Sequence, residues 1–186
     1  MATTSSPYGL KPVKRADGMP YAGAVTHYLI DPAGVANNIF TGSVVQLTAA
    51  GFVELADGTG KDITTNNFGG SSIGALGVFV GCDYVNTEGQ TTYSSYYPTG
   101  TTGVVHAYVV DDPNVVFQCQ LDAVSGQDDV GAITGFVAAQ NATVQTTVGG
   151  LLILGFVDPT VVTEAFPDVL VKFTTGGHHL MMNTGV

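Results

Sequence analysis

The chain has 186 residues, of which 45% are hydrophobic and 11% are charged, and its formal net charge is −10. This length and hydrophobic content predict one folded domain, and the acidic balance argues against nucleic acid as a partner, because duplex DNA and RNA bind to basic faces. Charged residues make up roughly 25% of an average soluble domain, so this surface must be largely neutral or apolar; that favours contact with a partner, and a solvated Thr- and Gly-rich surface is the alternative.

The N-terminal segment carries charge of the opposite sign to the rest of the chain. Lys11, Lys14 and Arg15 are three of the five basic residues, and no acidic residue precedes them. We therefore predict an extended basic arm over residues 1–18 and a single β-rich domain over residues 19–186. The arm suits an acidic neighbour, such as the next copy of this protein, and an ordinary solvated terminus is the alternative.

No segment of the sequence has the pattern of a targeting or membrane element. The first residues lack the apolar core of a signal peptide, and no apolar run reaches the ~20 residues that span a bilayer. We expect synthesis in the cytoplasm of a host cell and no membrane partner.

Short strands separated by turns dominate the first half of the chain. Val, Thr, Tyr and Phe favour strands, and 25 glycines and 8 prolines interrupt them. We predict a strand over 24–30 that ends at the turn 31–34, and a hairpin that joins 43–48 to 52–56. The fold class that follows is mostly β, an antiparallel β-barrel or sandwich with at most one or two short helices.

Residues 73–85 are predicted to form the long central strand. Alternation places Leu76, Val78, Val80, Cys82 and Tyr84 on one face and two glycines, Gly77 and Gly81, on the other. Glycines four positions apart leave bare backbone, which an aromatic ring or a second backbone can approach closely.

The clearest predicted hairpin joins residues 104–110 to 115–121 through Asp111-Asp112-Pro113-Asn114, a typical turn sequence. In its second strand the apolar side chains alternate with polar ones, which predicts one face on the core: Val115, Phe117, Cys119 and Leu121. Beyond it, residues 128–140 are ambiguous between helix and strand, and 151–157 and 169–173 are predicted strands.

No pattern predicts catalysis, a metal or a cofactor. The chain has four histidines, His27, His106, His178 and His179, but no nucleophile motif of the G-x-S-x-G type. Gly58–Lys61 fails as a phosphate loop, and we expect a surface turn there. Cys82 and Cys119 belong to no C-x-x-C pair, so buried free thiols are expected, with a disulfide as the alternative.

Residues 91–101 combine three tyrosines, Tyr93, Tyr96 and Tyr97, with Ser and Thr. Tyrosine offers large contact area at little cost in conformational entropy, and small hydroxyl residues add adaptable hydrogen bonds. This composition predicts an interface segment; a strand whose tyrosines cover the local core is the alternative.

Five segments, in order between residue 7 and about residue 121, resemble a known family. They are PYGLKPV (7–13), FTGSVV (40–45), GVFVGCDY (77–84), YYP (96–98) and AYVVDDPN (107–114). Together they resemble the head decoration, or cement, proteins of tailed bacteriophages. The sequence departs from that family at Tyr97, where Trp is frequent, and at Ser43, where Asp is frequent, and residues after 122 match only by general pattern.

The resemblance implies a non-enzymatic virion protein on the outer capsid surface, present in many copies. Such proteins bridge neighbouring major capsid subunits and hold the shell against the pressure of packed DNA, usually as a homo-oligomer and most often a trimer. The residues expected to contact the capsid or another partner are Tyr8, Lys11, Lys14, Arg15, Tyr93, Tyr96 and Tyr97. A tail-tube or other virion component is one alternative, and a carbohydrate-binding surface module is the other.

Overall fold

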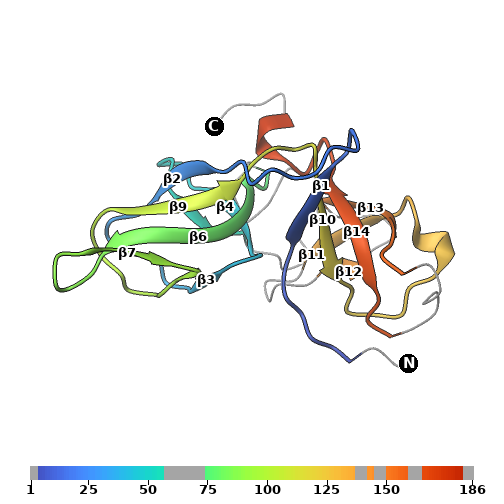
Figure 1. Cartoon of the computed structure of the whole chain (residues 1–186), viewed down its shortest axis with the longest axis horizontal. Helices are drawn as coiled ribbons and strands as arrows, with labels where there is room; N and C mark the ends of the chain where they lie inside the picture. The colour runs from blue at the N-terminus through green and yellow to red at the C-terminus, as the bar shows by residue number, and fades with distance from the viewer. Residues whose placement is uncertain (1–3, 57–73, 137–141, 145–149, 159–164, 182–186) are drawn as a thin grey trace.

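The computed structural model describes residues 4–56, 74–136, 142–144, 150–158 and 165–181. The described chain is mostly β, as the sequence predicts, and its two main sheets lie side by side along the long axis of the molecule (Figure 1). The helical elements in the described ranges are two single turns, η2 (Gln127–Asp129) and η3 (His179–Met181). The predicted turn at 58–61 and the end of the ambiguous segment 128–140 lie outside the described residues.

The first sheet has six strands in the order β1-β10-β14-β13-β11-β12, and each pairs antiparallel with its neighbours. The N-terminal strand therefore forms one edge beside a strand at least 100 residues away in sequence. The strand bounds are β1 Lys11–Arg15, β10 Val115–Gln120, β14 Asp168–Phe173, β13 Leu151–Phe156, β11 Ile133–Phe136 and β12 Ala142–Val144.

The second sheet has the order β4-β5-β2-β9-β6-β7, and a further pairing between β4 and β6 closes its first five strands into a barrel. The predicted β4–β5 hairpin is confirmed. The bounds are β4 Val44–Leu47, β5 Val53–Leu55, β2 Thr26–Ile30, β9 Val105–Val110, β6 Gly77–Val85 and β7 Thr91–Ser94. A two-stranded ribbon, β3 (Ile39–Phe40) with β8 (Tyr96–Tyr97), accompanies the barrel.

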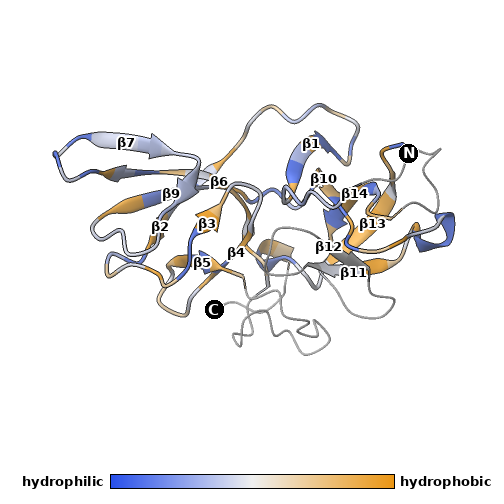
Figure 2. Ribbon diagram, turned by 90° about the horizontal axis from the view of Figure 1, so that it is seen from below, coloured by the Kyte–Doolittle hydropathy of each residue, from blue (hydrophilic) through white to orange (hydrophobic). Residues whose placement is uncertain are grey.

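Two clusters of buried side chains form the core. One fills the barrel, with Phe79, Ile30 and Tyr97 among its largest members. The other lies on the first sheet, and it includes the four alternating residues of β10 that the sequence predicts: Val115, Phe117, Cys119 and Leu121. In Figure 2 hydrophobic stretches lie in the strands of both sheets, and hydrophilic ones lie in turns and also in strands such as β1 and β5.

The predicted hairpin between 104–110 and 115–121 is wrong. The strand β9 pairs with β2 and β6 in the barrel, whereas β10 pairs with β1 and β14 in the first sheet. The Asp111–Asn114 turn forms as expected, with the amide of Val115 donating to the carbonyl of Asp112 at 3.1 Å. It connects the two sheets and does not join paired strands, because β9 and β10 each pair with strands that are distant in sequence.

The strict alternation predicted for residues 76–84 is also wrong. The register of β6 on β9 shifts between Phe79 and Gly81, which is the signature of a β-bulge. Leu76, Phe79 and Cys82 consequently belong to the barrel core, while Val78 joins the cluster on the first sheet and Val80 packs against it. One strand thus supplies side chains to both cores.

The expected close approaches at Gly77 and Gly81 are confirmed. A Cβ atom at Gly77 would lie 2.2 Å from the carbonyl oxygen of Val110, and one at Gly81 would lie 2.4 Å from the hydroxyl of Tyr93. Cys82 and Cys119 are buried free thiols, one in each core cluster. Burial is the main cause that raises the pKa of Cys82 to about 11 and that of Cys119 to about 12.

The N-terminal segment is hydrogen-bonded to the first sheet of the same molecule. Beyond β1, the side chain of Gln120 accepts a hydrogen bond from the amide of Ser6 at 2.6 Å and donates one to the carbonyl of Thr4 at 3.2 Å. An arm that leaves this position to cross a neighbouring subunit stays a prediction, as does the boundary at residue 18. No helix among the described residues is both long enough and apolar enough to cross a membrane.

Candidate partner-binding surface

A surface groove of about 530 Å³ lies where the N-terminal segment crosses the barrel. The N-terminal segment forms one wall, the loop before β4 and strand β6 form the other, and β10 contributes one glutamine. Its lining is Tyr8, Leu10, Lys11, Pro12, Thr41, Gly42, Val80 and Gln118. The groove therefore joins residues that are far apart in the sequence.

Two glycines fix this crossing. The amide of Leu10 donates to the carbonyl of Gly42 at 2.8 Å, and the amide of Gly42 donates to the carbonyl of Phe79 at 2.8 Å. A Cβ atom at Gly9 would lie 2.6 Å from the oxygen of Gly42, and both glycines have positive φ angles, 78° and 90°. Only residues without a side chain allow the two backbones to come this close.

Lys11 is the one charged residue that lines the groove, in a chain with fifteen acidic residues. Lys11 and Lys14 are exposed, and neither forms an ion pair within the described residues. The groove and the edge of β1 therefore present positive charge on a protein whose net charge is −10. This arrangement favours an acidic partner at this point.

Tyr8 connects the groove to the first sheet. Its hydroxyl donates to the carboxylate of Asp168 on β14 at 3.0 Å, and 37% of the residue is exposed. Burial and, after it, the hydrogen bond to Asp168 raise the pKa of Tyr8 well above its usual value. The hydroxyl therefore stays a protonated donor, and the residue remains partly exposed to the solvent.

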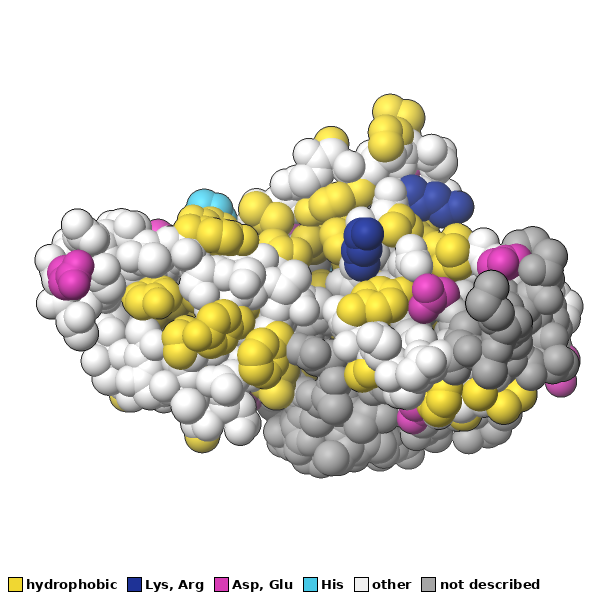
Figure 3. Space-filling model, turned by 60° about the horizontal axis from the view of Figure 1, so that its bottom comes forward, with side chains coloured by type: hydrophobic (Ala, Val, Ile, Leu, Met, Phe, Trp, Pro, Cys, Tyr) yellow, Lys and Arg dark blue, Asp and Glu magenta, His cyan; other side chains and the backbone are white. Residues whose placement is uncertain are grey.

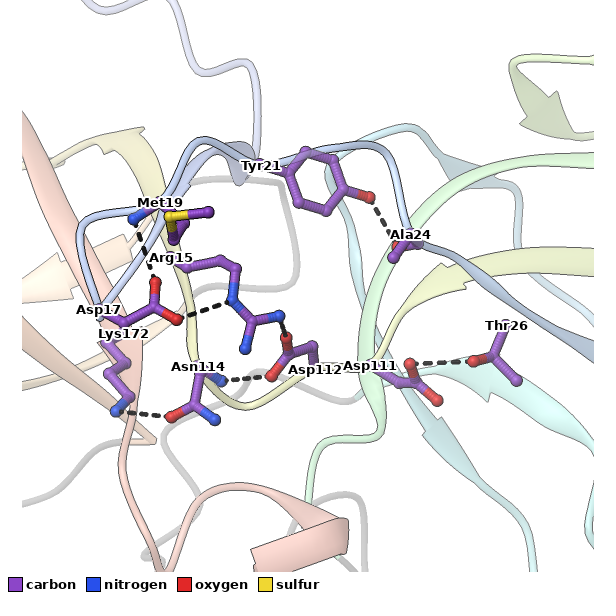
Figure 4. Close-up of polar contacts among 10 residues, drawn as sticks. All are labelled: Arg15, Asp17, Met19, Tyr21, Ala24, Thr26, Asp111, Asp112, Asn114 and Lys172. Atoms are coloured by element: carbon purple, nitrogen blue, oxygen red, sulfur yellow. Dashed lines mark hydrogen bonds and ion pairs between the residues drawn. The ribbon is translucent and has the colours of Figure 1, made fainter.

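Arg15 has a structural role in this arrangement. Its guanidinium contacts Asp112 at 2.6 Å and Asp17 at 3.3 Å (Figure 4). The neighbouring Asp111 instead accepts hydrogen bonds from Thr26 at 3.0 Å and Tyr28 at 2.7 Å on β2. The two adjacent carboxylates thus hold the connection between the sheets from both sides, one on the N-terminal segment and one on the barrel.

We expect Asp112→Ala to lower the free energy of unfolding by about 1–2 kcal/mol, because it removes a charge-assisted contact to Arg15 and the hydrogen bond from the amide of Asn114. The matched control is Asp17→Ala, which removes the longer and more exposed contact to the same guanidinium together with the hydrogen bond from the amide of Met19, and should lower stability less. Urea unfolding followed by circular dichroism measures both. Equal losses in the two variants would contradict the role given to Asp112.

The three candidate tyrosines occupy different environments. Tyr93 is 62% exposed and Tyr96 is 43% exposed, but Tyr97 is completely buried in the barrel core. The hydroxyl of Tyr97 donates to the carbonyl of Thr101 at 2.8 Å and accepts from the amide of Val35 at 3.3 Å. Tyr97 is therefore a packing residue, and the accessible candidates on this segment are Tyr93 and Tyr96.

The exposed tyrosines belong to an aromatic surface on the outside of the barrel. Tyr96 and Phe40 lie opposite each other on β8 and β3 with nearly parallel rings 5.9 Å apart. Tyr93 lies 5.8 Å from Tyr108. The barrel half of the face in Figure 3 carries hydrophobic side chains among uncharged ones, with acidic side chains only toward its edges, and a basic side chain lies near the middle of the molecule.

The histidines lie in different surroundings in the described part of the chain. His106 contacts Asp83 at 3.2 Å on the outside of the barrel, whereas His178 is buried beside Phe173 with ring centroids 5.2 Å apart. No group of three or more potential metal ligands occurs among the described residues. The absence of an enzymatic function stays a prediction from the sequence.

Comparison of the chain with protein-family models, with curated proteins and with solved structures returned no significant match.

Sequence reasoning identified Tyr8 and Lys11 but missed the barrel side of the groove, Thr41, Gly42 and Val80. The signal that pointed toward it was the pair of glycines, Gly9 and Gly42, each next to a strand. The structure brings together Tyr8 and Lys11 at the groove and places Tyr93 beside it, since Tyr93 and Thr41 both donate to the carbonyl of Val80. Arg15 and Tyr97 take structural roles instead.

Proposed function

We propose that this chain is a non-enzymatic capsid decoration protein, which binds the outside of a tailed-phage head and stabilises the shell by bridging neighbouring capsid subunits. The observation that carries the proposal is the contact surface itself. Its groove is lined mainly by apolar groups, with Lys11, Thr41 and Gln118 as the polar side chains. The exposed rings of Phe40, Tyr96 and Tyr93 lie near it on a nearly uncharged face. A surface with this composition is suited to adhesion.

The positions of the family-like segments support the proposal. Residues 7–13 form one wall of the groove, residues 77–84 lie in β6, which contributes to both cores, and residues 107–114 include the connection between the sheets. At each of these places the fold restricts the side chains. A resemblance at such places is evidence for a similar architecture, and the role of decoration protein comes with that resemblance.

The mechanism would be adhesion through many modest contacts. Each copy binds its neighbours through the groove and the aromatic rings, and Lys11 and Lys14 meet acidic groups of the major capsid protein or of a second copy. Because each lattice contact is reinforced by others on the same shell, detaching one copy does not release the subunits that the others hold. No chemical step and no cofactor are needed.

Binding to heads tests this function. Purified protein is mixed with expanded heads of the same phage that were prepared without it, and the bound copies per head are counted after sedimentation. We expect saturation at a fixed ratio to the capsid subunits. Failure to bind, with rings or tubes formed by the free protein, would overturn the proposal in favour of a tail-tube component.

We expect Lys11→Glu to weaken binding to heads by about tenfold, because it reverses the only charge in the groove and repels acidic groups on the partner. The matched control is Lys172→Glu, which makes the same change of net charge on β14, where the lysine donates a hydrogen bond to Asn114 at 3.5 Å. Quantitative sedimentation at two salt concentrations measures both. Equal weakening by the two variants would show that overall charge, and not the groove, governs binding.

A further inference from the structure

The outer face of the barrel carries a ladder of side chains that do not line the groove, although one of them, Tyr93, also belongs to the exposed rings of the proposed adhesive surface. The register of four strands places His27 of β2 beside Tyr108 of β9, and Tyr108 beside Gly81 of β6. One step along the same strands, His106 lies beside Asp83, and Asp83 lies beside Tyr93 of β7. Neighbouring positions on this face thus alternate between aromatic and hydrogen-bonding groups.

Tyr93 has the geometry of a stacking platform. Three atoms of its side chain lie between 2.4 and 2.8 Å from where a Cβ of Gly81 would be, so the ring rests on the bare backbone of β6. Its hydroxyl donates to the carbonyl of Val80 at 3.2 Å, which fixes the ring in that position. Yet 62% of the residue is exposed, so the opposite side of the ring remains open to a ligand.

The surroundings of this ring add a second aromatic group and polar partners. Tyr108 lies 5.8 Å from Tyr93 with its ring tilted by 31°, and His27 packs edge-on against Tyr108 at 4.4 Å. The Asp83 carboxylate lies 3.2 Å from Nδ1 of the partly exposed His106. An open aromatic face next to a carboxylate and an imidazole combines stacking with hydrogen-bond acceptors and donors on one rigid sheet.

We propose that this ladder is a binding site for an uncharged saccharide. The apolar C–H face of a pyranose ring would stack on Tyr93 and Tyr108, and its hydroxyls would hydrogen-bond to Asp83 and His106. Asp83 is the only acidic group of the ladder and lies 3.2 Å from Nδ1 of His106, and the ladder contains no Lys or Arg. This charge balance suits a neutral polyol better than an anionic polymer or a strongly charged protein surface.

Binding to immobilised oligosaccharides tests the inference. The full chain is applied to an array of neutral glucose-, galactose-, mannose- and N-acetylglucosamine-based oligosaccharides with sialylated and sulfated ones beside them, and hits are titrated by calorimetry. We expect the unmodified protein to bind a subset of the neutral glycans. The affinity of Tyr93→Ala for these glycans should be at least about tenfold weaker. Tyr93→Phe should retain binding, because the stacking ring remains.

The matched control is Tyr96→Ala, which removes an exposed tyrosine that pairs with Phe40 outside the ladder and should leave glycan affinity unchanged. Lys11→Glu should also leave it unchanged, which separates this site from the adhesive groove. The inference is overturned if no neutral glycan binds, if only acidic glycans bind, or if Tyr93→Ala binds as the unmodified protein does. Loss of self-association in Tyr93→Ala without any glycan binding would assign the ladder to a contact between copies and would overturn it as well.

Discussion

Gly77→Ala is expected to lower the free energy of unfolding by about 3 kcal/mol, the upper range for overpacking a core. The added methyl group would lie 2.2 Å from the carbonyl oxygen and 2.9 Å from the carbonyl carbon of Val110, and 3.0 Å from Cα of Asp111. These are backbone atoms at the end of β9, where the barrel continues into the connection to the first sheet. They cannot move aside without disturbing both the barrel and the connection to the first sheet.

Thermal unfolding followed by circular dichroism measures this effect, and we expect a transition roughly 6–12 °C lower for a domain of this size. The matched control is Gly155→Ala on β13, where an added Cβ meets no atom within 4 Å and the backbone has no positive φ. That variant should stay within about 0.5 kcal/mol of the unmodified protein. Similar stability of the Gly77→Ala and Gly155→Ala variants would contradict the close approach of β6 to β9.

Acidification from pH 7 to pH 4 is expected to remove about 3 kcal/mol of stability through His178 alone. Burial lowers the pKa of this histidine to about 4 from an ordinary value of 6.5, against the opposing influence of Asp111 and Asp112. The amide of Leu180 donates to Nδ1 at 3.2 Å, so the neutral ring carries its proton on Nε2, which has no hydrogen-bond partner in the described structure. A second proton would have to displace that bond.

The sign of this dependence follows from the direction of the pKa change. Because the folded state holds the proton less tightly than the unfolded state, stability is full above about pH 6.5 and falls as the unfolded chain becomes protonated. The loss ends near pH 4, where the folded state is protonated as well. Urea unfolding at several pH values measures the profile, and His178→Gln should flatten it between pH 6.5 and 4, whatever its effect on stability at neutral pH.

His179→Gln is the control for this prediction, because it removes the adjacent histidine but leaves the buried ring of His178 in place. The free energy of unfolding of this variant should fall with decreasing pH as steeply as that of the unmodified protein. An unchanged slope in His178→Gln would show that the carboxylates, and not this histidine, govern acid sensitivity.

Local rules predicted the elements that depend on neighbouring residues. The β4–β5 hairpin, the turn after β2 and the buried face of β10 all follow from alternation and turn residues within a few positions. The close approaches at Gly77 and Gly81 were predictable for the same reason, since a glycine inside a strand has few other uses.

The predictions that were wrong concern elements whose pairing partners lie far away in the sequence. A turn such as Asp111–Asn114 favours a hairpin locally, but β9 gains two barrel neighbours and β10 gains β1 and β14, which no local pattern specifies. The bulge in β6 could not be predicted from the sequence either, because it lets one strand place side chains in two cores that form from distant segments. The groove lies between segments more than 30 residues apart, so the sequence indicated only its N-terminal wall, through Tyr8 and Lys11, and its pair of glycines.

The stability of loaded heads tests the central claim most directly. Heads filled with DNA and lacking this protein are heated with and without a saturating amount of it, and the temperature at which DNA is released is recorded with a DNA-binding dye. The account predicts release at a higher temperature once the protein is bound, with Lys11→Glu needing a higher concentration to give the same protection. Saturating binding without any change in the release temperature would contradict a role in holding the shell together.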